Sequence, residues 1–346
     1  MVRRWLGNVA VVVTSVVAAL VVAEFAIPHI ITLRNVGASF TVYDPVVWNR
    51  LKPNFETVRV TPDFTMRFST NSLGARGAEP SGPVKQPVLF LGDSFTMGYG
   101  VSDGQEYPAL LGQKLGLRHG TQAPLMLNLG MGASGNGFWL KHLQTTAVAV
   151  QPRLVVLQVL QNDFWDNTVE GLYRLDEKGE LVELPVPPPR FARRVQTVVE
   201  SIPGLANSNL MGLVRQAMSN DPGFSIAGRP TQPGAAASAP APQRLEPGDT
   251  LTLKLVEAAL RKCQAERWPV ILLSVGLQAP QRAAIRQVAE QVGTPLLELP
   301  SRTERPDLYF KIDGHWNAQG HVEAAEALLQ RIDALQLLPL QVKSSP

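Results

Sequence analysis

Short runs made only of apolar residues alternate with longer segments that have apolar positions three or four residues apart. The short runs predict buried parallel strands, and the longer segments predict helices. The predicted strands cover residues 88–91, 125–129, 154–160, 270–275 and 295–299. The predicted helices cover residues 105–115, 138–150, 251–265, 281–292 and 317–335. Strands that alternate with helices in this way predict an α/β three-layer sandwich around a parallel sheet of about five strands.

The amino terminus has a different pattern. An uncharged apolar stretch from Trp5 to Ala23 follows Arg3 and Arg4, and it is close to the length that spans a bilayer as a helix. Val21-Val22-Ala23 is a poor cleavage site, so residues 1–30 are predicted to be an uncleaved transmembrane signal anchor. The two arginines favour a cytoplasmic amino end, which predicts a single-pass inner-membrane protein with a periplasmic or otherwise extracytoplasmic body.

The remaining chain divides into a collar and a main domain. Residues 31–83 combine turn residues with short β-like runs and predict a β-rich collar or linker. Residues 84–346 form the predicted main domain, interrupted by an insertion at about 164–248. Its Pro/Ala-rich part, at about 221–248, is expected to be disordered. The insertion is interpreted as a surface excursion in preference to a lid.

Composition limits the possible partners and cofactors. The net charge of +3 is spread along the chain without a dense basic run, so a nucleic-acid partner is not expected. Cys263 is the single cysteine, which excludes an internal disulfide and a cysteine-based metal cluster. The oligomeric state is left open by the sequence.

Candidate chemistry begins where the first predicted strand of the sheet ends. Asp93-Ser94 follows that strand directly, and ligands of open α/β sheets bind at the carboxyl ends of strands. Ser94 is therefore either a nucleophile or only the cap of the next helix. A serine nucleophile needs a base, and His315 is the best placed of the five histidines, between the last strand and the last helix. Asp313 is placed to accept a hydrogen bond from its Nδ1. Asp313 and His315 could instead bind a metal, or Asp313 could cap the last helix.

Acyl transfer also requires donors for an oxyanion. Three strand ends offer them: the Ser94 N–H, a backbone N–H of the glycine-rich turn 130–137, and the side-chain amide of Asn162. The glycines could instead serve turn geometry alone, and Asn162 could form an ordinary Asx turn. Together with Ser94 and His315, these features favour an active site.

These motifs resemble the conserved blocks of the SGNH/GDSL hydrolase superfamily, in the order in which that family uses them. The residues that carry the resemblance are Gly92-Asp93-Ser94, Asn128-Leu129-Gly130, Asn162-Asp163 and Asp313-Gly314-His315, within residues 86–335. The anchor, Lys52-Pro53-Asn54 and residues 70–76 resemble a membrane-tethered bacterial branch of it. The resemblance implies a flavodoxin-like sandwich, Ser94 as nucleophile, His315 as base and Asp313 as its orienting partner.

The resemblance further implies oxyanion donors at Ser94, at a residue of the second block and at Asn162. Gly135 is the predicted second donor, with Gly132 and Ala133 as rivals. The last block departs from the family, which more often has Asp-x-x-His than Asp-x-His. The predicted function is a membrane-anchored serine esterase that cleaves an acyl ester on an envelope glycan or lipid, without cofactor or metal. The alternatives are an O-acyltransferase of cell-surface polysaccharide and a non-catalytic envelope component that keeps the fold.

Overall fold

The computed structural model describes residues 2–31, 39–189, 191–220 apart from 203, 206 and 207, and 245–338 apart from 246. The chain forms two compact units. The smaller unit comprises Met1–Ser39, Val58–Phe64 and Pro189–Gln232, and the larger comprises Phe40–Thr57, Thr65–Pro188 and Pro233–Pro346. The predicted disordered tract lies outside the described residues from 221 to 244. Pro247 and Gly248, at the end of the predicted tract, are instead the first residues of a helix, where proline is favoured.

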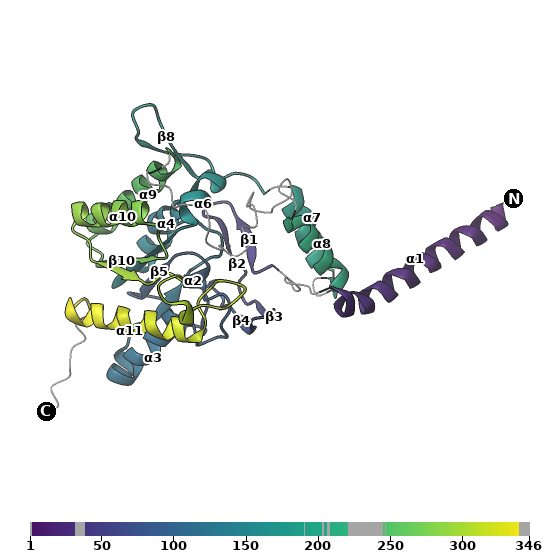
Figure 1. Ribbon diagram of the computed structural model, residues 1–346, viewed down its shortest axis with the longest axis horizontal. Helices are drawn as coiled ribbons and strands as arrows, with labels where there is room; N and C mark the ends of the chain where they lie inside the picture. Colours follow the sequence, from purple (N-terminus) through teal and green to yellow (C-terminus); the bar gives the residue numbers. More distant parts are fainter. Residues whose placement is uncertain are drawn as a thin grey trace. The chain divides into compact units, whose positions relative to one another are not determined.

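A five-stranded parallel sheet is the centre of the larger unit (Figure 1), and the strand order is β11-β10-β7-β5-β6. This order is flavodoxin-like, and it confirms the predicted fold class. The chain reverses its direction of winding between β5 and β7, and crevices at such a switch point are where ligands bind. The strands are β5 (Val88–Leu91), β6 (Met126–Asn128), β7 (Leu154–Leu160), β10 (Val270–Val275) and β11 (Leu296–Leu299).

Helices cover both faces of this sheet, and β5 and β7 are therefore buried along their whole length. Packed pairs of helices form the two outer layers, α3 with α11 in one and α4, α9 and α10 in the other (Figure 1). The helices of the larger unit are α2 (Ser94–Met97), α3 (Tyr107–His119), α4 (Asn136–Gln144), α5 (Thr146–Val150), α6 (Asp163–Glu170), α9 (Pro247–Ala265), α10 (Ala279–Val292) and α11 (Ala318–Ala334), with short 3₁₀ turns η1 (Gly120–Gln122) and η3 (Pro306–Leu308).

The helix predicted over 138–150 is two helices. The break falls at Thr145, whose hydroxyl donates to the Lys141 carbonyl at 2.7 Å and so competes with the backbone ladder. The structure also has short strands outside the main sheet, and the first four of them lie within residues 31–83, where the sequence predicts a β-rich segment. These strands are β1 (Thr41–Asp44), β2 (Trp48–Leu51), β3 (Glu56–Val60), β4 (Thr65–Ser69), β8 (Tyr173–Leu175) and β9 (Leu181–Glu183).

The smaller unit contains α1 (Val2–Ile30), α7 (Phe191–Glu200) and α8 (Asn209–Asn220). Helix α1 includes a span, Gly7–Ile30, that is long and apolar enough to cross a membrane, with a mean hydropathy of 2.5. Glu24 lies within this span and caps the amino end of α8. Its carboxylate accepts hydrogen bonds from the Asn209 and Leu210 amides at 2.6 and 3.1 Å.

Candidate active site

Ser94 is the first residue of α2, directly after the carboxyl end of β5. Asp93, and not Ser94, caps this helix, because the Asp93 carboxylate accepts from the Phe95 amide at 3.0 Å. The Ser94 hydroxyl does not cap the helix, and it can donate to Asp93 Oδ2 at 3.3 Å. Its Oγ lies 2.8 Å from Nε2 of His315, a residue 221 positions away in the sequence.

His315 lies in the loop between η3 and α11, and both of its ring nitrogens are engaged. Nε2 faces Ser94, and Nδ1 is hydrogen-bonded to Oδ1 of Asp313. Gly314 has a φ of 87°, in the left-handed region that favours glycine, and this turn brings the side chains of residues 313 and 315 together. The Asp-x-His spacing therefore still pairs the two groups.

Aromatic rings pack against the His315 ring, and the Asp313 carboxylate bonds to it on the other side. The His315 ring packs 5.1 Å from the Phe95 ring and 5.0 Å from the Tyr99 ring. Burial raises the pKa of Asp313, but the hydrogen bonds and charge of His315 together with the charge of Arg302 outweigh it, and the net pKa lies below its ordinary value. Asp313 is therefore ionised at neutral pH and favours the tautomer of His315 that carries its proton on Nδ1. Within the described residues, no group of three His, Cys, Asp or Glu side chains could hold a metal ion.

Asn162 follows β7, the strand beside β5, so it lies at the same rim of the sheet as Ser94. Its Nδ2 donates to Asp93 Oδ2 at 3.0 Å and to Asp166 Oδ2 at 2.6 Å. Both amide hydrogens are thus directed at carboxylates in this structure. The Asp93 bond ties the ends of β5 and β7 together.

The amide of Gly135, the predicted second oxyanion donor, is already engaged. It donates to Glu170 Oε1 at 2.6 Å, and a Cβ at this position would lie 2.8 Å from the Asn167 backbone nitrogen. Glycine is needed here because α4 begins against α6. The rivals lie nearer to Ser94: a Cβ on Gly132 would be 3.6 Å from the Ser94 Cβ, and Ala133 has a left-handed φ of 59°.

Sequence patterns gave no indication that α6 would cap α4. Asn167 Oδ1 accepts from the Asn136 and Gly137 amides, at 2.6 and 3.1 Å, while Glu170 serves Gly135. Burial raises the pKa of Glu170 to about 8. Burial and the neighbouring Asp93 carboxylate also raise the pKa of Asp163 well above its ordinary value. Only the i,i+3 spacing of Asn167 and Glu170 could have suggested a shared role.

Arg76 holds the loop that follows the Ser94 helix. Its buried side chain ties this loop down. Its guanidinium donates to the carbonyls of Met97, Gly98 and Val101 at 2.8, 2.5 and 2.7 Å. Its ion pair with Asp103 Oδ1 spans 3.2 Å. The Arg76 backbone also bridges to Asn128 of the edge strand β6, at an N···O distance of 3.0 Å.

Comparison with known proteins identifies the family of the chain. The profile of the GDSL-like lipase/acylhydrolase family matches residues 90–281, more than half of the chain. No curated protein matches the chain significantly.

Solved structures resemble the chain at low identity. LAE5, an α/β hydrolase from the metagenome of Lake Arreo, Spain, is 15% identical over 73% of this chain and 98% of its own, with a TM-score of 0.42. TesA is 16% identical over 72% and 99%, with a TM-score of 0.41. Axe2, an acetylxylan esterase from Geobacillus stearothermophilus, is 12% identical over 72% and 95%, with a TM-score of 0.39. The family match over residues 90–281 shows that the chain belongs to the GDSL-like lipase/acylhydrolase family and is a serine ester hydrolase.

Proposed function

We propose that Ser94, His315 and Asp313 are the catalytic triad of a membrane-anchored esterase that works through an acyl-enzyme. The observation that carries this proposal is the 2.8 Å contact between Ser94 Oγ and His315 Nε2, with Asp313 on the far side of the ring. A neutral serine hydroxyl is a weak nucleophile, and this arrangement supplies both a base and a partner that orients it.

The chemical steps follow from these positions. The Ser94 oxygen attacks the ester carbonyl carbon while its proton passes to His315 Nε2. The tetrahedral intermediate expels the alcohol, which takes that proton, and leaves an acyl group on Ser94. Water, deprotonated by the same nitrogen, then attacks the acyl carbon. The acid is released and the serine hydroxyl is restored.

The oxyanion is held by the Ser94 N–H, the Asn162 side chain and an amide of Gly132 or Ala133. The proximity of Gly132 to Ser94 supports the last assignment over Gly135, whose N–H serves Glu170. For Asn162, one amide hydrogen would exchange its carboxylate partner, Asp166, for the oxyanion. Such hydrogen bonds commonly tighten only when a substrate is bound.

The triad is tested with a fluorophosphonate probe and a chromogenic acetyl ester. Ser94→Ala is expected to abolish labelling and to lower ester hydrolysis by at least about 10³-fold. Ser201→Ala, an exposed serine on another unit, serves as the matched control and keeps both activities. Equal labelling of Ser94→Ala and wild type would refute the assignment.

We also propose that α1 anchors the protein in the inner membrane, with the catalytic body in the periplasm. The apolar span of α1 and the arginines before it support this orientation. Cys263 is fully buried and should not react with a membrane-impermeant maleimide, so labelling by this reagent reports on engineered cysteines. Leu117→Cys, at a position that is 90% exposed, is expected to react in intact spheroplasts, whereas Val2→Cys reacts only after lysis. The opposite result would reverse the orientation.

A tethered esterase acts on esters within reach of the membrane, so the proposed substrate is an acyl group, such as O-acetyl, on an envelope glycan or lipid. The test is release of acetate from acetylated envelope polysaccharide by the purified full chain. Ser94→Ala is the inactive control. Release of acetate from a soluble chromogenic ester, but from neither envelope glycans nor envelope lipids, would contradict this substrate class.

A further inference from the structure

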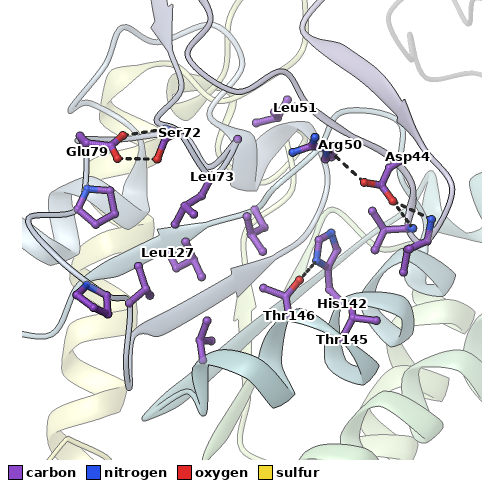
Figure 2. A pocket seen from close by; sticks show the side chains of 18 of the residues that line it. Asp44, Arg50, Leu51, Ser72, Leu73, Glu79, Leu127, His142, Thr145 and Thr146 are labelled. Atoms are coloured by element: carbon purple, nitrogen blue, oxygen red, sulfur yellow. Dashed lines mark hydrogen bonds and ion pairs between the residues drawn. The ribbon is translucent and has the colours of Figure 1, made fainter.

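A cavity lies at the β6 edge of the sheet, beneath the β1–β2 hairpin and the 72–84 segment (Figure 2). Its volume is about 580 Å³, within the range of small-molecule sites. Ser94, Asn162, Asp313 and His315 do not line it, so it is separate from the candidate active site. All of its lining residues belong to the larger unit.

The walls of this cavity are mainly aliphatic. The side chains come from the collar, the sheet edge and α5, and they include Leu51, Leu73, Val84, Leu127, Leu129 and Val150. Phe138 is the one Phe, Tyr or Trp ring among the described lining residues, so the cavity lacks the stacked rings that commonly bind sugars. Such walls suit an alkyl chain.

The ionised groups of the lining already have partners within the protein. Asp44 Oδ2 lies 3.2 Å from Arg50 Nε, and Asp44 Oδ1 accepts from the Val46 amide at 2.8 Å. Glu79 accepts from the Ser72 amide and hydroxyl at 2.8 and 2.6 Å. The cation of the lining is therefore already paired and both carboxylates already accept hydrogen bonds, so an uncharged ligand fits better.

His142 supplies the polar contact. It is only 6% exposed, its Nδ1 lies 2.9 Å from Thr146 Oγ1, and its Nε2 has no hydrogen-bond partner in the described protein. In Figure 2 the ring is joined to Thr146 by a dashed line at one nitrogen, and it extends from there toward Arg50. Burial lowers its pKa to about 4, so the ring is neutral at neutral pH. A ligand hydroxyl can donate or accept, and it satisfies Nε2 in either tautomer.

We propose that this cavity binds an uncharged single-chain amphiphile with a hydroxyl head group. The alkyl chain lies against the aliphatic walls, and the hydroxyl bonds to His142 Nε2. Free long-chain alcohols and monoacylglycerol-type lipids share this chemistry. The site is distinct from the ester-cleaving centre and does not require Ser94.

The test is photo-crosslinking of the full chain in lipid nanodiscs with a decanol that carries a mid-chain diazirine, followed by peptide mapping. We expect saturable labelling of peptides within 44–51 and 127–150. Unlabelled 1-decanol and 1-O-decylglycerol, an ether that an esterase cannot cleave, act as competitors. Competition by decanol alone identifies a free alcohol as the ligand, whereas stronger competition by the glycerol ether identifies the lipid source.

Variants separate this site from the catalytic one. Val84→Trp fills the cavity and is expected to reduce labelling about tenfold, while Val148→Trp, on an exposed position of α5, leaves it unchanged. His142→Phe removes one hydrogen bond and is expected to weaken competition by decanol about fivefold. Ser94→Ala retains the labelling.

Three results would overturn the proposal. One is labelling that does not saturate or that persists in Val84→Trp, with thermal unfolding confirming that this variant is folded. Another is labelling confined to α1 or to peptides that contain Ser94 or His315. The third is decanoate competing more strongly than decanol, which would identify an anion site at Arg50.

Discussion

Replacing Arg76 tests whether the collar holds the active-site loop. Arg76 is 2% exposed, and its guanidinium donates to the carbonyls of Met97, Gly98 and Val101. Hydrogen bonds that involve a charged group contribute about 1.5–3 kcal/mol each, but such values do not add, and breaking a buried charged network costs about 3–5 kcal/mol in total. Arg76→Met is therefore expected to lower the free energy of unfolding by about 4 kcal/mol.

Further variants locate the source of this loss. Arg76→Lys keeps the charge but lacks the planar fork, so it is expected to lose about 2 kcal/mol. Burial raises the pKa of Glu106, and Arg76 opposes this shift from 3.8 Å away. Glu106→Gln in the Arg76→Met background removes the remaining buried acid and is expected to recover part of the stability.

The assay is denaturant unfolding of the full chain, followed by tryptophan fluorescence, with esterase kinetics on the folded fraction. Arg67→Met, on the exposed face of β4, is the matched control and should change stability by no more than about 0.5 kcal/mol. The Arg76 loop carries Tyr99 against the His315 ring, so kcat is expected to fall about tenfold in the folded Arg76→Met protein. Stability losses that are equal in the two methionine variants would refute the reasoning.

Three further predictions concern the candidate site. Asp313→Asn leaves the imidazole in the wrong tautomer and should lower kcat by roughly 10³–10⁴-fold with KM little changed; a loss below tenfold contradicts the assigned role. Gly135→Ala places a Cβ against α6 and should cost about 1–3 kcal/mol in stability without changing kcat of the folded enzyme; a selective fall in kcat would return Gly135 to the oxyanion site. The pKa of Glu170 is about 8 in the folded protein and takes its ordinary value of 4.5 in the unfolded chain. The contribution of Glu170 to stability is therefore complete below pH 4.5 and is lost as the pH rises toward 8. Glu170→Gln removes this loss, so the stability difference from wild type should change by up to about 1.4 kcal/mol per pH unit in that window; a constant difference refutes it.

Sequence patterns determined the strands of the sheet because a strand that is buried on both faces is apolar at nearly every position. The runs at 88–91, 154–160 and 270–275 match β5, β7 and β10 at both ends. The position of Ser94 directly after the first of these strands followed from the same apolar run. Short-range chemistry is less visible, as the break at Thr145 shows, because one side-chain hydrogen bond was enough to divide an otherwise helical segment.

Long-range partners could not be obtained in this way. The engagement of Gly135 by Glu170 depends on how α4 meets α6, and the cavity around His142 exists only because the collar covers the edge strand. Neither contact repeats with a period along the chain. The sequence by itself determined the α/β elements, the apolar amino-terminal span and the candidate residues Ser94, Asp313 and His315. Only the tertiary structure decided which groups meet, because hydrogen bonds between residues tens to hundreds of positions apart depend on packing and leave no periodic signal.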